Sequence, residues 1–388
     1  MDRSAIDRLA DDRFRATFVD LCSRHRVLGL VLSRLTGADM RDGVPAVDEF
    51  DRLLRPLRRR AMIFEAKRDH LAGVLQARGI ETVILKGAAL ATTIYREPVE
   101  RDLADLDLLV RPTAIRPAVR AFAEEGYSLP PQRGRVWTYR RHHFHLPLSH
   151  PDGHVVEVHW ALSRPGSPFG LGAGAILDQA VAYRPLAGPG QRHPRPEHMI
   201  LHLALQNLRE GFSRLARLVD MDRIIASQPD LDWSALTRIA CNEGLASPAA
   251  LSLRLLSRLF GIEVPEEAAR ALRPSAVSRA HLAMLRPEHS LLTQRSERTY
   301  SAKSLLELWL LRGTRSRASS LLGMLKPKVR VAAYRREIRG WFGRCLKLGK
   351  VIIFQLSLYA SAAAAQLTRS GRDQMRFWSS QASSSERL

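Results

Sequence analysis

The sequence has little of what marks a secreted, disulfide-bonded protein. Its 388 residues include three cysteines, Cys22, Cys241 and Cys345, which lie far apart and lack the spacing of metal ligands. The first eight residues carry too many charges for a signal peptide. An odd and sparse set of cysteines favours a reducing compartment, so we expect a cytoplasmic protein.

Long hydrophobic runs are also scarce. The main apolar stretch covers residues 351–367, but these 17 residues include Gln355, Ser357 and Tyr359. A membrane-spanning helix needs about 20 mostly apolar residues. We therefore expect no transmembrane span and favour a helix packed against protein, with a helix lying in a membrane interface as the alternative.

Acidic residues are too few to balance the basic ones. The chain holds 60 Lys and Arg against 39 Asp and Glu, which gives a formal net charge of +21 at pH 7. Residues 301–388 hold 17 basic and 4 acidic residues, so this region is a candidate for contact with a polyanion such as nucleic acid. Arginine outnumbers lysine throughout the chain, so a coding bias is the alternative explanation of the excess.

What the chain does contain suits folded domains, because a hydrophobic content of 45% over 388 residues is enough for two cores. Apolar spacing and turn residues predict strands at 80–85, 103–110, 136–140, 142–148 and 154–160. The same signals predict helices at 4–36, 46–78, 88–96, 112–125, 196–210, 212–227, 232–244, 246–260 and 264–272. Residues 161–195 are rich in Gly and Pro, which predicts a mobile connection. The order of elements indicates an α+β fold, with a mixed sheet flanked by helices and then a mostly helical C-terminal half.

Two acidic residues stand out inside the apolar segment 103–110. Asp105 and Asp107 are spaced i and i+2, which places their side chains on the same face of a strand. Adjacent carboxylates repel each other unless a cation lies between them. Mg²⁺ takes oxygen ligands and commonly combines one or two carboxylates with substrate phosphates. The pattern therefore indicates metal-assisted chemistry on a phosphate.

These residues also carry a family resemblance. The chain reads Leu85-Lys86-Gly87, then Tyr95, Arg101 and Asp105-Leu-Asp-Leu-Leu-Val110, and this order resembles the polymerase-beta-like nucleotidyltransferase superfamily. Within it, the chain is most similar to the uncharacterised nucleotidyltransferase family, over roughly residues 50–260. The superfamily takes a third acid from a later strand, and Glu157 in residues 155–160 matches it. The chain departs from the superfamily's Gly-Ser or Gly-Gly turn, because it has Lys86-Gly87, as is typical of the narrower family.

The resemblance implies the transfer of a nucleoside monophosphate from a nucleoside triphosphate such as ATP to an acceptor, which could be a small molecule, a peptide or an RNA. It implies that Asp105, Asp107 and Glu157 are catalytic and bind Mg²⁺. Lys86, Gly87 and Arg101 are then the candidate nucleotide-binding residues. The implied organisation comprises N-terminal helices in 1–78, a nucleotidyltransferase core in 79–162, a connection in 163–195, a helical domain in 196–300 and a basic helical region in 301–388.

Each of these assignments has an alternative. Asp105 and Asp107 can form salt bridges with Arg101 and Arg111, Glu157 can be an exposed hairpin residue, and Lys86 can be paired with an acid. Six histidines between positions 142 and 159 allow a zinc site, although no cysteine lies near them. A non-catalytic nucleic-acid-binding protein that uses residues 301–388 is the alternative function.

Overall fold

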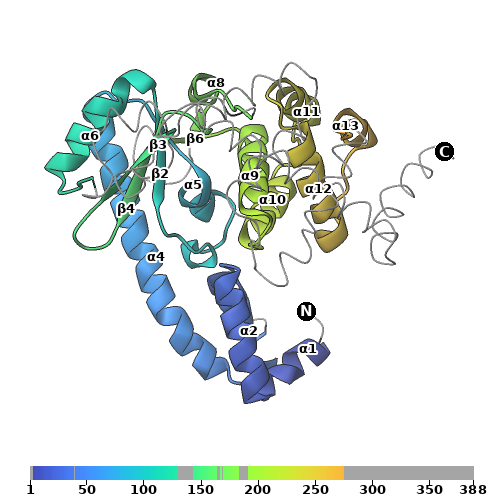
Figure 1. Cartoon of the computed structure of the whole chain (residues 1–388). Coiled ribbons are helices and arrows are strands. Elements are labelled where there is room, and N and C mark those ends of the chain that lie inside the picture. Colours follow the sequence, from blue (N-terminus) through green and yellow to red (C-terminus); the bar gives the residue numbers. More distant parts are fainter. Residues whose placement is uncertain are drawn as a thin grey trace, which may run out of the picture.

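The computed structural model describes residues 3–38, 40–129, 143–163, 167, 169–182 and 191–274. These residues form an α+β fold in which a small mixed sheet is surrounded by many helices. Figure 1 shows the long helix α4 running from the N-terminal helices past the sheet, with α5 between the sheet and the helices α9 to α12. The predicted fold class is confirmed for the described residues, whereas the predicted helical region 301–388 lies outside them.

The sheet consists of β1 (Thr82–Ile84), β2 (Leu106–Val110), β3 (His145–Ser149) and β4 (Val155–His159), in the order β1-β2-β4-β3. Strands β2 and β4 run parallel, and the two outer pairs are antiparallel. The register pairs Asp107 with Glu157 and His145 with His159. All five residues of β2 are buried, as expected for a central strand covered on both faces. The pairing brings chemistry-bearing side chains from three strands to one region.

The predicted helix 4–36 is wrong as a single element. The segment instead contains α1 (Arg3–Asp7), a 3₁₀ turn, α2 (Asp12–Arg24) and α3 (Leu28–Leu35). Asp11 begins α2 by accepting a hydrogen bond from the Phe14 amide at 2.7 Å. Between α2 and α3 the chain turns sharply at Arg26, whose φ of 57° lies in the left-handed region. We call residues 25–27 the elbow.

Helix α4 (Val47–Gln76) confirms the long helix predicted at 46–78, and Gly79 follows it in the left-handed conformation. The N-terminal helices and the first part of α4 enclose a small core of their own, which also includes Val99 from the loop before β2. Gly29 in α3 lies so close to that loop that an added Cβ would be 1.9 Å from the Val99 carbonyl oxygen. The N-terminal helices are therefore packed tightly against the segment that leads to Asp105 and Asp107.

Two helices flank the strands of the core. Helix α5 (Lys86–Thr93) begins two residues earlier than predicted, and α6 (Ile115–Glu124) follows a 3₁₀ turn that starts at Pro112. Strand β2 is shorter than the predicted 103–110, so that Asp105 lies just before the strand rather than inside it. The strand predicted at 136–140 lies outside the described residues.

The segment predicted to be a mobile connection contains regular structure. Its described residues form α8 (Ala173–Asp178) and a two-stranded antiparallel ribbon of β5 (Val181–Ala182) and β6 (Arg192–His193). Arg192 donates to Glu81 at 2.7 Å and to the carbonyl oxygens of Leu177 and Ala180. These long-range bonds hold the ribbon against the start of β1, which local Gly and Pro content cannot reveal.

The helical half agrees closely with the prediction up to residue 271. It comprises α9 (Pro196–Glu210), α10 (Ala216–Ser227), α11 (Trp233–Asn242), α12 (Ala246–Phe260) and α13 (Glu266–Ala271). Asp232 caps α11, because its carboxylate accepts from the Ala235 amide at 2.8 Å. Helix α10 begins later than predicted because Gly211 and Phe212 both have left-handed φ values and break the helix. Within the described part of the chain, every helix is too short or too polar to cross a membrane.

Candidate active site

Three carboxylates meet where the parallel strands β2 and β4 lie side by side. Asp105 precedes β2, Asp107 lies within it, and Glu157 is the β4 residue paired with Asp107. One oxygen from each carboxylate lies within 4.8 Å of the others. The structure thus brings together all three residues that the sequence predicted to bind a metal. Such a set of oxygen donors suits a hard divalent cation.

Asp107 is the buried centre of this cluster. Its Oδ1 lies 2.7 Å from Lys86 Nζ and 2.7 Å from His159 Nε2, and the residue is 3% exposed. Burial opposes its ionisation, but the charge of Lys86 and the hydrogen bond from His159 hold the pKa of Asp107 well below its ordinary value. Asp107 is therefore a carboxylate at neutral pH. The contact between Lys86 and Asp107 also agrees with the alternative prediction that Lys86 is paired with an acid.

Asp105 differs because no hydrogen bond or ion pair engages its carboxylate among the described residues. Burial and the charge of Asp107 raise the pKa of Asp105, while the positive charges of Lys86 and Arg26 oppose that rise. Two neighbouring carboxylates of which one has no partner constitute an incomplete charge arrangement. A bound cation would balance the negative charge of Asp105, so these residues fit a divalent metal ion.

Two histidines extend the cluster toward β3. His159 Nε2 lies 3.3 Å from Glu157, and His145 Nε2 lies 3.6 Å from the other Glu157 oxygen. Burial and the neighbouring His159 lower the pKa of His145 to about 2, so its imidazole is neutral. These three side chains form a second donor set that shares Glu157 with the first. Of the predicted histidine group, His150 and His154 lie elsewhere, beside Asp152.

The candidate nucleotide-binding residues lie at the start of α5 and in the loop before β2. An added Cβ at Gly87 would lie 3.0 Å from Leu103 and 3.4 Å from the Arg101 guanidinium, so the glycine allows these two side chains to pack closely over the start of α5. Arg101 Nε donates to Asp220 at 2.8 and 3.0 Å, and the Tyr95 hydroxyl donates to the same carboxylate at 2.6 Å. The alternative pairing of Arg101 with Asp105 is thus wrong. Asp220, fully buried in α10, ties the helical half to the core.

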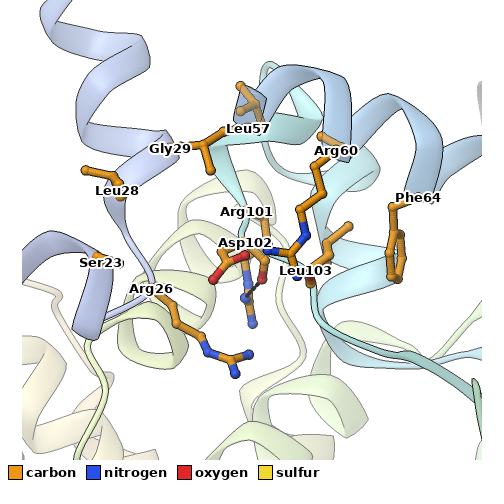
Figure 2. Close-up of a pocket in the computed structure, with 12 residues that line it drawn as sticks. Ser23, Arg26, Leu28, Gly29, Leu57, Arg60, Phe64, Arg101, Asp102 and Leu103 are labelled. Atoms are coloured by element: carbon orange, nitrogen blue, oxygen red, sulfur yellow. Dashed lines mark hydrogen bonds between the residues drawn. The ribbon is translucent and has the colours of Figure 1, made fainter. Parts of the chain in front are cut away.

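A cavity of about 130 Å³ adjoins the loop before β2 and is lined in part by residues that sequence reasoning missed. Figure 2 shows the side chains of Arg26, Arg60 and Arg101 converging from the elbow, α4 and the loop before β2. Arg60 donates to the Leu103 carbonyl at 3.1 Å. In a chain so rich in arginine, no local signal distinguishes Arg26 or Arg60 from the other basic residues.

The fold and the carboxylate cluster agree with the class expected from the sequence, that of nucleotidyltransferases. The model of a family described as "Uncharacterised nucleotidyltransferase" matches residues 15–261, and the chain belongs to this family. The predicted resemblance is thereby confirmed, and the match begins earlier than residue 50, so that it includes α2, the elbow and α3. A search of curated proteins finds no match to the chain.

Proposed function

We propose that the protein transfers a nucleoside monophosphate from a nucleoside triphosphate to an acceptor hydroxyl or other nucleophile. The observation that carries this proposal is the meeting of Asp105, Asp107 and Glu157 within 4.8 Å in a chain of the nucleotidyltransferase family. In the reaction, an acceptor oxygen forms a bond to the α-phosphorus, the bond to pyrophosphate breaks, and the acceptor proton passes to a base. The transition state is anionic, so positioned charges do most of the work.

Asp105, Asp107 and Glu157 would hold Mg²⁺, whose charge would stabilise the attacking and leaving oxygens. Lys86 and His159 keep Asp107 ionised and fix its orientation, since each lies 2.7 Å from its Oδ1. Glu157 borders the site from β4 and completes the arrangement that activates the acceptor hydroxyl. Gly87 lies in the first turn of α5, whose backbone amides would attract a phosphate, because the N-terminus of a helix attracts anions.

The helical half supplies the opposite wall in this proposal. His202 on α9 lies within electrostatic reach of Lys86 and His159, and Asp220 on α10 holds Arg101 in place. The acceptor would therefore approach between the sheet and α9. Its identity as a small molecule, a peptide or an RNA end stays a prediction from the resemblance.

A binding and transfer experiment on the full chain tests the proposal. The four nucleoside triphosphates are compared in a thermal-shift assay with and without Mg²⁺, and radiolabelled nucleotide is then offered with acceptor mixtures. We expect Mg²⁺-dependent stabilisation by at least one nucleotide, because a ligand that binds the folded state stabilises it by mass action. Asp105→Asn should reduce transfer by about a hundredfold or more while leaving the fold intact.

Asp105 is the suitable position because Asp107 has buried partners that substitution would leave unpaired. The matched control is Asp42→Asn, since Asp42 is an exposed carboxylate in the N-terminal helices. Transfer that is equal in the wild type and in Asp105→Asn would refute the carboxylate mechanism.

A further inference from the structure

The charges expected to meet a triphosphate are largely neutralised within the protein. Lys86 is paired with Asp107 at 2.7 Å, and Arg101 is paired with Asp220 at 2.8 Å. Four negative charges on a nucleotide need cations that are still available. Such cations line the cavity beside the loop that precedes β2.

Arg26 is the most available cation in this region. It lines the cavity from the elbow, and no hydrogen bond or ion pair engages its guanidinium among the residues that the structure describes. Its charge is nevertheless felt by Asp105 in the carboxylate cluster and by Arg214 in the loop before α10. Arg26 therefore lies between the metal-binding candidates and the helical half.

Arg214 adds to the positive charge there. Its guanidinium shares the single carboxylate of Glu210 with Arg217, at 3.8 and 2.5 Å respectively. Burial and the charge of Arg26 lower the pKa of Arg214, which means that these like charges repel each other in the absence of an anion. Apart from the carboxylate cluster, the cavity and the loop before α10 bring together five arginines and three carboxylates, namely Arg26, Arg60, Arg101, Arg214 and Arg217 with Asp102, Glu210 and Asp220.

Backbone strain is concentrated at the same place. Four non-glycine residues among those described have a left-handed φ, and three of them, Arg26, Lys86 and Phe212, belong to the elbow, the start of α5 and the loop before α10. The elbow and that loop are also bonded directly, since the Ala216 amide donates to the His25 carbonyl at 3.2 Å and the Leu215 amide to His25 Nδ1 at 3.3 Å. Strained backbone that is held by such contacts is typical of ligand-binding sites.

We propose that Arg26 and Arg214 form a polyphosphate-binding site that takes the β- and γ-phosphates of the donor nucleotide. The inference rests on the proposed function for the identity of the ligand, and it makes the N-terminal helices part of the active site. One end of the region carries the carboxylate cluster, and the other carries Arg26 and Arg214, whose charges are at most partly balanced by described carboxylates. A metal–triphosphate complex has the same polarity, with its cation at one end and its anionic tail at the other. Guanidinium groups suit such phosphates because they donate in pairs.

Binding of inorganic tripolyphosphate to the full chain, measured by titration calorimetry without metal, tests the site independently of catalysis. We expect Arg26→Gln and Arg214→Gln each to weaken binding about tenfold, as for the loss of one charge-assisted hydrogen bond, and Arg26→Lys to restore part of the affinity. The matched control is Arg24→Gln, because Arg24 lies in α2 next to the elbow but is paired with Asp20 on the surface. The control should bind as the wild type does.

The same variants are then assayed for nucleotide transfer, where Arg26→Gln should raise the KM for the donor more than it lowers kcat. No binding by the wild type, equal affinity of Arg26→Gln and wild type, or an equal loss in Arg24→Gln would each overturn the inference. Arg26-dependent binding of tripolyphosphate without transfer of any nucleotide would support the site and reject the proposed function. If transfer depends on Asp105 but is unchanged in Arg26→Gln, the proposed function is supported and the phosphate site is rejected.

Discussion

At the scale of single residues, His202 shows how burial near the candidate site affects the protonation of a side chain. It lies in α9, is 1% exposed, and neither ring nitrogen has a hydrogen-bond partner among the residues described. Burial, together with the positive charges of Lys86 and His159, places the pKa of His202 well below its ordinary value, and Asp107 opposes this only in part. The imidazole is therefore neutral in the folded protein.

This neutrality predicts a loss of stability in acid. Below about pH 6.5 the unfolded chain binds a proton on His202 that the folded chain does not, so the free energy of unfolding falls by up to about 1.4 kcal/mol for each further pH unit. Above pH 6.5 neither state is protonated there, and His202 has no such effect. We expect His202→Leu to flatten the pH dependence between pH 6.5 and 5, measured by urea unfolding.

His70 provides the comparison for His202. Its side chain is 59% exposed, so His70→Leu is the matched histidine-to-leucine substitution at the surface. An unaltered slope in His202→Leu would show that His202 is protonated in the folded state or reached by solvent.

At the scale of secondary-structure elements, the packing of α3 against the loop before β2 positions the cavity. Gly29 permits this packing, because a Cβ there would overlap the Val99 carbonyl oxygen at 1.9 Å. The contact joins the element that follows Arg26 to the segment that contains Arg101. The relative position of the two arginines thus depends on a glycine within a helix.

We expect Gly29→Ala to destabilise the protein by about 1–3 kcal/mol, the usual cost of overpacking a closely packed contact. Gly73→Ala is the matched change, since Gly73 also lies in a helix but nothing comes within 4 Å of its added Cβ. This second variant should be as stable as the wild type or up to about 1 kcal/mol more stable, because alanine favours helix. Denaturant unfolding of both variants gives the comparison, and equal stabilities would show that α3 and the loop can separate freely.

At the scale of the whole molecule, the helical half and the core are joined by a buried ion pair. Asp220 of α10 accepts hydrogen bonds from Arg101 and Tyr95, both of which precede β2. Because an unpaired buried charge is costly, the two halves are held in one relative position. Arg101, a candidate nucleotide-binding residue, is thereby fixed in its orientation by the helical half.

The net positive charge of the whole molecule is the basis of the alternative function, in which residues 301–388 contact a polyanion. If they do, the full chain should bind single-stranded RNA with an affinity that falls steeply with salt, because neutralised phosphates release counterions. Deleting residues 301–388 should then weaken binding and reduce the slope of log K against log salt concentration. Fluorescence anisotropy at several salt concentrations measures both, with full-length Asp105→Asn as the control that should bind normally. Equal affinity with and without residues 301–388 would remove the basis of the alternative.

The sequence was informative wherever a local pattern carries the structure. The long helix α4 and the helices α9 and α12 were predicted correctly, and Asp105 and Asp107 lie together as their spacing indicated, although Asp105 precedes the strand instead of lying within it. Periodicity and capping are properties of neighbouring residues, so they can be read along the chain. The elbow at Arg26 and the β5–β6 ribbon were missed, because a left-handed arginine and a ribbon held by Arg192 depend on contacts with distant segments.

By itself, the sequence determined the family and most elements of the core, and it singled out three acidic residues as candidates for a metal site. Only the tertiary structure decided which charges remain available around that site. It paired Lys86 with Asp107 and Arg101 with Asp220, and it brought the guanidinium of Arg26 beside the cavity, where none of the described residues pairs with it. The physical reason is that electrostatic pairing depends on distance in space, and residues 119 positions apart in the chain, such as Arg101 and Asp220, become neighbours only when the helical half packs on the core.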